Sequence, residues 1–481
     1  MSIKYLLHFT FITLTGVFLA GFLPAARHLL ITRVTADTLQ PIAGNAKDYK
    51  GKSVVSTSGV IRFASGLDND YYQLDSVNRT GYLYIETTVQ PFIQENVKRV
   101  PLNLSIVIDR SGSMKGEKME FARKAAKDIL DKLKEEDYVS IVVYDDRVDV
   151  IQPSVQAKNK EAIKTKIDEI VPRGSTNLWG GAEIGYNQVV SRYKPRFINR
   201  VLLISDGLVN QGLTSARAIK LNVQRYKDDH GITLSAFGVG LDFNEVLMTE
   251  MAEAGAGNYY FIEAPEKMAA MFDKELNGLL HVAAQNAEWA IKLPDGIQAE
   301  RAYPLKYEAV ENVVTVKFRD LFSGETKGVL LKFRMEDSVR SPLKFAATLT
   351  YTDIATGQKR SVTNENFLNP VKNGEAYLTF FNKSVLEQTI LFTANENMEK
   401  AMLDADKGNY DKALQSLDAN SNYLRANAYY AADSEALQQM DSVNRVYFTE
   451  LKRAKELGKD TVKLLQKTSR SESYKIRNKK Q

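Results

Sequence analysis

The spacing of hydrophobic and polar positions changes three times along the chain. In residues 53–100, the stretches "SVVSTSGVIRF" and "TGYLYIETTVQPF" alternate apolar and polar residues, as half-buried strands do. From residue 101, continuous apolar runs alternate with stretches of helical spacing. After Ala284 the period of two returns and persists to about residue 370, and from Ser384 the spacing is helical. The order predicted is therefore β, then α/β, then β, then helical.

Five apolar runs in residues 101–283 have the length and continuity of strands that are covered on both faces. They are Val100–Asp109, Tyr138–Tyr144, Arg200–Gly207, Thr233–Gly240 and Asn258–Glu263. Amphipathic helices are expected between them; Glu117–Lys134 places Met119, Ala122, Ala126, Ile129 and Leu133 on one face. This alternation predicts an α/β fold with a doubly wound, mostly parallel sheet and helices on both faces.

The two β stretches, 53–100 and 284–370, flank the α/β domain in sequence. We expect them to pair into one sandwich-like module, into which the α/β domain (residues 101–283) is inserted. Residues 37–52 have little pattern and are expected to be a linker. Residues 371–468 should form a helical region, in which Met402–Ala419 has the pattern of a helical hairpin, either generic or of the tetratricopeptide kind.

A length of 481 residues is enough for two or three domains, and 44% hydrophobic and 26% charged residues are ordinary for globular proteins. The net charge of +5 is uneven: residues 452–481 hold eleven Lys or Arg and three acids, so this segment carries +8 and the remainder −3. The basic pI of the chain therefore comes from this carboxyl-terminal segment. We expect a solvated helix end followed by a basic disordered tail over 469–481, in preference to nucleic-acid or lipid binding.

The amino terminus contains a mostly apolar segment, Tyr5–Leu23, which follows a single Lys and is closed by Pro24. A cleaved secretory signal within residues 1–36 and a retained membrane anchor are equally compatible with it. Either predicts export of the rest of the chain, to the periplasm or the cell surface.

The absence of cysteine excludes disulfides, thiolate metal sites and cysteine nucleophiles. Only four histidines are present, and no His-Glu-x-x-His motif occurs, which disfavours histidine-based catalysis and zinc proteases.

Oxygen-bearing side chains follow two of the expected strands and one loop. "DRSGS" supplies Asp109, Ser111 and Ser113, "RGSTN" supplies Thr176, and "SDG" supplies Asp206. Ligands bind at the carboxyl ends of the strands in open α/β sheets, so these side chains should meet there. Such hard donors suit Mg²⁺, or Mn²⁺ or Ca²⁺, better than zinc or copper. A carboxylate from a partner protein could then complete the metal's coordination.

The stretch from about Pro101 to Leu280 resembles the von Willebrand factor A domain, and the same five residues match its metal-ion-dependent adhesion site. The resemblance implies that these residues hold a divalent cation that bridges to an acidic residue of a partner. The stretches "PLNLSIVIDRSGSM", "FGVGLDFNEVLM" and "GAGNYYFIE" are similar to exported bacterial proteins labelled Ca-activated-chloride-channel-like, and to inter-alpha-trypsin-inhibitor heavy chains.

Three functions remain open at this point. The first is cation-dependent binding of a protein partner, with no catalytic or organic-cofactor residues and no nucleic-acid ligand. The second is a structural envelope scaffold, whose metal only stabilises the fold. The third is a metal-dependent hydrolase, which the sequence disfavours because position 111, where an acid two residues after Asp109 would act, is a serine.

Overall fold

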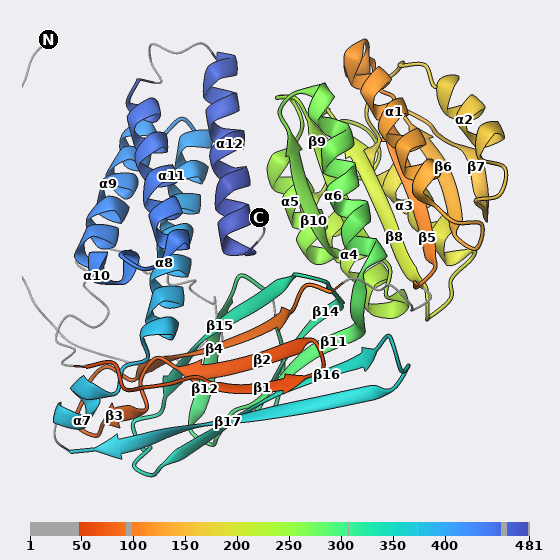
Figure 1. The fold of residues 1–481 in the computed structure, drawn as a ribbon. Coiled ribbons are helices and arrows are strands. Elements are labelled where there is room, and N and C mark those ends of the chain that lie inside the picture. Colours follow the sequence, from red (N-terminus) through yellow and green to blue (C-terminus); the bar gives the residue numbers. More distant parts are fainter. Residues whose placement is uncertain (1–47, 93–98, 306, 373, 454–458, 480–481) are drawn as a thin grey trace, which may run out of the picture. The chain divides into compact units, whose positions relative to one another are not determined.

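The computed structural model describes residues 48–92, 99–305, 307–372, 374–453 and 459–479 (Figure 1). The segment Tyr5–Leu23 and most of the expected linker lie outside these ranges. The described residues form an α/β domain, a module of two β-sheets and a carboxyl-terminal helical region. No helix within these ranges combines the length and apolar character needed to cross a bilayer.

The α/β domain is built on a six-stranded sheet in the order β10-β9-β8-β5-β6-β7. The strands are β5 (Leu102–Asp109), β6 (Tyr138–Tyr144), β7 (Val148–Gln156), β8 (Ile198–Ser205), β9 (Thr233–Val239) and β10 (Ala256–Ile262). All are parallel except β7, which pairs antiparallel with β6 at the sheet edge. The hydrophobic pattern did not predict β7, because Pro153 and several polar residues interrupt it. Proline is tolerated at an edge, where one side of the strand makes no ladder bonds.

Helices cover both faces of this sheet, which confirms the doubly wound arrangement (Figure 1). One apolar cluster unites the sheet with α1 (Glu117–Lys132), α2 (Lys160–Asp168) and α6 (Met268–Leu280). The other unites it with α3 (Leu178–Val190), α4 (Ala216–His230) and α5 (Glu245–Ala254). Two short 3₁₀ turns, η2 (Gly112–Met114) and η3 (Pro265–Lys267), precede α1 and α6.

Short polar side chains fix where several of these helices begin. Asn159, Asn177, Ser215 and Asn244 each accept a hydrogen bond from the backbone N–H three residues ahead. Such N-caps satisfy one of the free N–H groups of the first helical turn. Asn244 thus fixes the start of α5.

The β module contains two sheets assembled from both sides of the α/β domain. One has the order β1-β2-β4-β15-β12, with β1 (Val54–Ser58), β2 (Ile61–Leu67), β4 (Thr80–Val89), β15 (Thr326–Met335) and β12 (Ile297–Tyr303). The central pairing joins β4 and β15 antiparallel, from Thr80 opposite Arg334 to Thr88 opposite Thr326. The chain therefore leaves this sheet, builds the α/β domain and returns, so the predicted insertion is confirmed.

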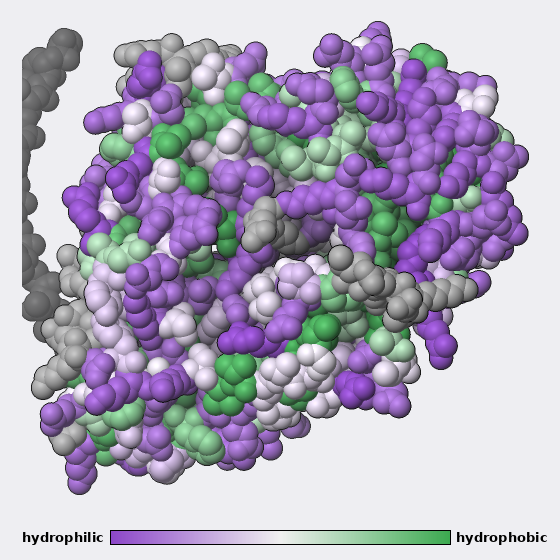
Figure 2. Space-filling view, viewed as in Figure 1, coloured by the Kyte–Doolittle hydropathy of each residue, from purple (hydrophilic) through white to green (hydrophobic). Residues whose placement is uncertain are grey.

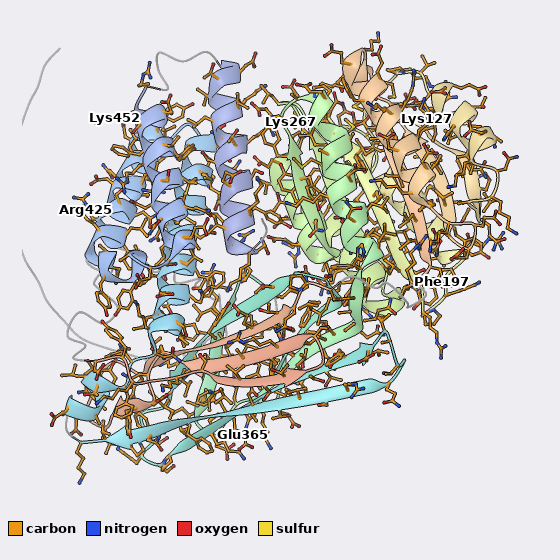
Figure 3. All side chains as sticks on the ribbon, viewed as in Figure 1. Lys127, Phe197, Lys267, Glu365, Arg425 and Lys452 are labelled. Atoms are coloured by element: carbon orange, nitrogen blue, oxygen red, sulfur yellow. The ribbon has the colours of Figure 1, made fainter. Side chains whose placement is uncertain are left out.

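The second sheet has the order β13-β14-β11-β16-β17-β3. Its strands are β13 (Glu308–Val310), β14 (Val313–Phe322), β11 (Val282–Lys292), β16 (Leu343–Asp353), β17 (Lys359–Val371) and β3 (Tyr71–Gln73). Side chains alternate along β17: Asn364 and Asn366 are buried, whereas Glu365 projects from the outer face (Figure 3). Between the sheets, Trp289 of β11 is fully buried and donates from Nε1 to Thr87 Oγ1 of β4 at 2.9 Å.

The helical region comprises α7 (Gly374–Thr379), α8 (Lys383–Asp406), α9 (Tyr410–Ala426), α10 (Ala428–Ala431), α11 (Glu435–Lys452) and α12 (Lys459–Arg477). The expected hairpin is formed by α8 and α9, which turn at Gly408 with φ of +79°. This left-handed conformation suits glycine because it has no Cβ.

The structure differs from the expectation of a basic disordered tail at 469–481. Helix α12 extends to Arg477, and Tyr474 is only 5% exposed. Its cations meet acids from distant parts of the chain: Lys463 pairs with Asp242 at 2.7 Å, and Arg477 pairs with Glu253 and Glu399. Local charge counting cannot detect such partners, which is why the segment looked like a free tail.

The outer faces of the helices are polar. Lys127 of α1 projects outward (Figure 3) and pairs with Asp168 of α2 at 2.6 Å. Hydrophilic residues cover most of the α/β domain in the view of Figure 2.

Candidate metal centre

The candidate site lies where the order of the sheet reverses. Strands β5 and β8 are adjacent and parallel, with Ile108 opposite Ile204. After β5 the chain continues to β6 on one side, and after β8 it continues to β9 on the other. The carboxyl ends of two such strands leave a crevice between their loops. Asp109 is the last residue of β5, and Asp206 directly follows β8.

The carboxylate of Asp109 is held by donors from both strand ends. Its Oδ1 accepts from the backbone N–H of Ser111, and its Oδ2 accepts from the hydroxyl of Ser205, both at 2.8 Å. Asp109 is completely buried. These bonds turn the chain sharply after β5 and orient the carboxylate toward the loop that follows β8.

Hydroxyl groups connect Asp109's loop to Asp206. The Oγ atoms of Ser111 and Ser113 are 3.0 Å apart, and Ser113 Oγ donates to Asp206 Oδ1 at 2.7 Å. The other oxygen of Asp206, Oδ2, accepts from Lys118 Nζ at 2.6 Å. The two carboxylates and two serines thus form one continuous cluster of oxygen atoms.

Thr176 reaches the same cluster from the loop before α3. A Cβ atom added at Gly207 would lie 2.9 Å from Thr176 Oγ1 and 3.6 Å from Ser113 Oγ. The backbone N–H of Thr176 donates to Asn210 Oδ1 at 2.8 Å, which joins this loop to the one after β8. The structure therefore brings together all five residues that the sequence singled out.

Backbone hydrogen bonds hold the loops together independently of side chains. Gly112 N–H donates to Gly174 O at 3.1 Å, and Arg173 N–H donates to Arg110 O at 2.7 Å. Access from solvent is one-sided: Asp109, Ser111, Thr176 and Asp206 are at most 3% exposed, whereas Ser113 is exposed.

The electrostatics of the cluster suit a cation. Burial raises the pKa of Asp109 to about 6, and the nearby charge of Asp206 adds to this effect, against the hydrogen bonds from Ser111 and Ser205. A divalent cation would favour the ionised form of both carboxylates.

Among the described residues, no group of three or more His, Cys, Asp or Glu could hold a metal, so hydroxyl oxygens are essential to this site. Two carboxylates and three hydroxyls are a donor set that fits a hard divalent cation.

Charged and aromatic side chains of the neighbouring loops have structural roles. Arg173 pairs with Asp145 at 2.8 Å, and Arg110 binds the same carboxylate, so both guanidinium groups brace the loops. Trp179 is 5% exposed and lies in the apolar core, where it packs between α3 and the sheet.

Two contributors were missed, Ser205 and Lys118. Ser205 directly precedes Asp206, and its place at a strand end was a usable signal. Lys118 carries no sequence signal that separates it from the neighbouring Lys115.

Known proteins resemble this chain in its α/β domain. The family model of the von Willebrand factor type A domain matches residues 103–274. Uncharacterized protein YfbK of Escherichia coli (strain K12) is 32% identical over 192 residues, covering 40% of this chain and 33% of that relative. Inter-alpha-trypsin inhibitor heavy chain H2 of Mesocricetus auratus is 26% identical over 320 residues, covering 63% of this chain and 32% of the relative. The chain thus spans about a third of the length of these two curated relatives.

Solved structures show the same fold. A von Willebrand factor type A protein from Catenulispora acidiphila aligns with a TM-score of 0.65 and 14% identity, covering 81% of this chain and 92% of that one. The ArnB paralog VWA2 from Sulfolobus acidocaldarius aligns with a TM-score of 0.58 and 13% identity, covering 86% and 98%. Together with the sheet order and the match over residues 103–274, these likenesses show that the chain contains a von Willebrand factor type A domain.

Proposed function

We propose that the protein binds a protein partner through a divalent cation, Mg²⁺ in the first place, held by Asp109, Ser111, Ser113, Thr176 and Asp206. The observation that supports this most directly is the convergence of five oxygen-bearing side chains at the carboxyl ends of β5 and β8, the switch point of the sheet. Von Willebrand A domains with this motif bind divalent metal ions, and domains of this family generally mediate protein–protein interaction.

The composition of the site favours a partner carboxylate as the remaining ligand. Mg²⁺ prefers about six oxygens in an octahedral arrangement. Three of the five side chains are neutral hydroxyls, so they leave the cation with unneutralised positive charge. Because Ser113 is exposed and the other four residues are buried, a partner's Asp or Glu would approach on the Ser113 side.

The alternative is a structural scaffold whose cation only stabilises the fold. The two buried carboxylates are consistent with it, because a cation would compensate their charge. The loops, however, are already joined by Gly112 to Gly174 and by Arg173 to Arg110. A metal is therefore not needed to close them, which favours the interaction function.

We further propose that the protein is not an enzyme. The two histidines in the described ranges lie away from the site: His230 ends α4, just before the amino end of β9, and His281 follows α6. The candidate cluster contains no general base other than its own aspartates. A hydrolase would need a group free to accept a proton from water.

An extracytoplasmic location, periplasmic or at the cell surface, is proposed from the sequence of Tyr5–Leu23. The same segment would associate the protein with a membrane if it is retained. Protease accessibility in intact cells and spheroplasts would test this, and protection in both would contradict it.

The central experiment is calorimetric titration of Mg²⁺ and Mn²⁺ into the full chain, kept in mild detergent. Wild type is compared with Asp109→Ala, Thr176→Ala and a control, Thr165→Ala, which changes an exposed threonine of α2. We expect one saturable site in wild type and the control, and its loss in Asp109→Ala. Equal Mg²⁺ binding by Asp109→Ala would contradict the site.

The interaction itself requires a second measurement. Wild type and Thr176→Ala, immobilised, are exposed to a detergent-solubilised envelope fraction in Mg²⁺ and then eluted with EDTA. The proposal expects a partner that is retained by wild type only and released by EDTA. If Thr176→Ala instead lowers thermal stability while every retained protein is insensitive to EDTA, the scaffold function is favoured.

A further inference from the structure

Lys118 places a positive charge directly against the candidate metal site. It lies in the first turn of α1, and its Nζ donates to Asp206 Oδ2 at 2.6 Å. Asp206 is fully buried, and the Lys118 side chain is 25% exposed. An ion pair with one buried partner is screened by solvent much less than a surface pair.

The ammonium group binds the carboxylate that a cation would need. Asp206 Oδ1 accepts from Ser113 Oγ, and Oδ2 accepts from Lys118, so both oxygens are engaged by the chain's own donors. Asp109, in contrast, accepts from two neutral donors in the described part of the chain, the Ser111 N–H and the Ser205 hydroxyl. The positive charge is therefore on the Asp206 side of the cluster.

We propose that Lys118 is an internal cation that competes with the divalent metal for Asp206 and thereby sets the metal affinity of the site. The inference rests on the metal site of the proposed function. An ammonium group and a metal ion at the same carboxylate repel each other strongly in a partly buried position. Metal loading then requires Lys118 to leave Asp206, which lowers the affinity for the metal.

The structure provides a place for the displaced side chain. A Cβ atom added at Gly240 would lie 3.4 Å from Lys118 Cε and 3.5 Å from Nζ, so the lysine already runs along the turn after β9. Asp242, two residues further, is exposed, with 64% of its side chain accessible. Its pKa is lowered by its hydrogen bond with Lys463 and, to a smaller degree, by the charge of Lys118. A displaced Lys118 would therefore remain near a second carboxylate, which it would share with Lys463.

A purely structural role predicts the opposite result. If Lys118 serves to hold Asp206 in position for the metal, its removal will disorganise the site and weaken metal binding. If it competes, its removal will strengthen binding. The sign of the change thus separates the two roles.

The test is Mg²⁺ titration of the full chain in wild type, Lys118→Met and Lys115→Met. Methionine keeps the length of the side chain and removes its charge. Lys115 is an exposed lysine of the loop that precedes α1, so Lys115→Met controls for the loss of one positive charge nearby. We expect Lys118→Met to bind Mg²⁺ about tenfold more tightly than wild type, and Lys115→Met to stay within about twofold. Equal or weaker binding by Lys118→Met overturns the inference.

A thermal measurement guards against a variant that is merely unstable. Without Mg²⁺, Lys118→Met leaves Asp206 buried without its ion-pair partner, so its melting temperature should fall. Saturating Mg²⁺ should restore it, which makes the Mg²⁺-induced shift larger than in wild type. A shift equal to or smaller than that of wild type overturns competition.

The outcomes also distinguish this inference from the proposed function. Saturable binding in wild type that Asp109→Ala abolishes, without tighter binding in Lys118→Met, rejects the role of Lys118 alone. If wild type and Lys118→Met both fail to bind Mg²⁺ and Mn²⁺, the metal site and the competition are rejected together.

Discussion

Ser205 and Asp109, which are 96 residues apart, join the ends of two neighbouring strands through a hydrogen bond of 2.8 Å. The bond fixes Asp109 Oδ2, while the Ser111 N–H fixes Oδ1. It also favours the ionised form of the carboxylate, because the Ser205 hydroxyl lowers the pKa that burial raises. Ser205 is thus a positioning residue for the candidate metal ligand.

We therefore expect Ser205→Ala to weaken Mg²⁺ binding and to destabilise the fold by about 1–2 kcal/mol, since a buried carboxylate oxygen loses its donor. Calorimetry and urea unfolding would measure the two effects. A matched control is Ser140→Ala on β6: Ser140 is also fully buried, but its hydroxyl has no hydrogen-bond partner in the described part of the chain. Equal effects of the two substitutions would show that the bond to Asp109 is unimportant.

The substitution Gly207→Ala tests whether the Thr176 loop must lie close to the loop after β8 for the metal to bind. In Gly207→Ala the new methyl group would lie 2.9 Å from Thr176 Oγ1, so the threonine or the loop must move. We expect a loss of Mg²⁺ affinity of about tenfold or more, with circular dichroism unchanged, because a metal site tolerates little displacement of its ligands.

The control for Gly207→Ala is Gly278→Ala in α6, where a Cβ would meet no atom within 4 Å. That change should leave Mg²⁺ binding unaltered and raise stability by about 0.5–1 kcal/mol, the usual gain for Ala over Gly within a helix. Unchanged Mg²⁺ binding in Gly207→Ala would place Thr176 outside the coordination sphere.

The metal-site residues could be predicted from sequence because most of them follow strands whose carboxyl ends lie at the same edge of the sheet. One predicted strand ends in Asp109, and another, Arg200–Gly207, contains Asp206 near its end. The alternating pattern implied a parallel sheet, in which the carboxyl ends of the strands lie at one edge, so the two carboxylates were expected to meet. Ser111 and Ser113 follow Asp109 so closely that no long-range information was needed. Thr176 was expected from the Gly-containing loop "RGSTN", and the family resemblance supported it; its position was the least constrained, since this loop does not directly follow a strand.

The remaining differences have a common cause in long-range pairing. Lys118 became part of the site only because α1 begins beside the loop after β8, and nothing local separates it from Lys115. The end of α12, from residue 469, was predicted to be a disordered tail because an acid that it meets, Glu253, precedes its partner Arg477 by more than 200 residues. Local patterns indicate which face of a helix is apolar, but they do not show which distant charges it meets.

Glu245 should make stability depend on pH. It is 4% exposed, and burial raises its pKa to about 7 in spite of the nearby cations Arg470 and Lys467. The folded state then binds a proton more tightly than the unfolded state, whose glutamate has its ordinary pKa near 4.5. Its contribution to the free energy of unfolding therefore falls as the pH rises from about 4.5 to 7, and is constant outside this window.

Glu245→Gln removes this titration while keeping an oxygen that can accept from Tyr259 Oη, now 3.2 Å from Glu245 Oε1. Relative to wild type, the variant should be more stable at pH 8 than at pH 4.5. Urea unfolding at a series of pH values measures the difference, with the exposed Glu161→Gln on α2 as control. A difference that stays constant between pH 4.5 and 8 would contradict the raised pKa.

Arg477 tests whether α12 is an integral part of the fold. Its guanidinium group contacts both Glu253 at the end of α5 and Glu399 of α8, and its side chain is 15% exposed. Arg477→Met should destabilise the protein by about 1–2 kcal/mol, because two partly exposed acids, Glu253 and Glu399, lose the cation that they share. Lys475→Met is the control: Lys475 pairs with Glu472 of the same helix, in a half-exposed contact that should contribute less than about 0.5 kcal/mol. Hydrogen exchange should also accelerate in α12 and β10 of Arg477→Met, since Tyr474 Oη accepts from the Tyr259 N–H. If the two variants unfold at the same urea concentration and exchange at the same rate, the contacts of α12 with the α/β domain do not contribute to stability, and the helix behaves in solution as the free tail that its charge first indicated.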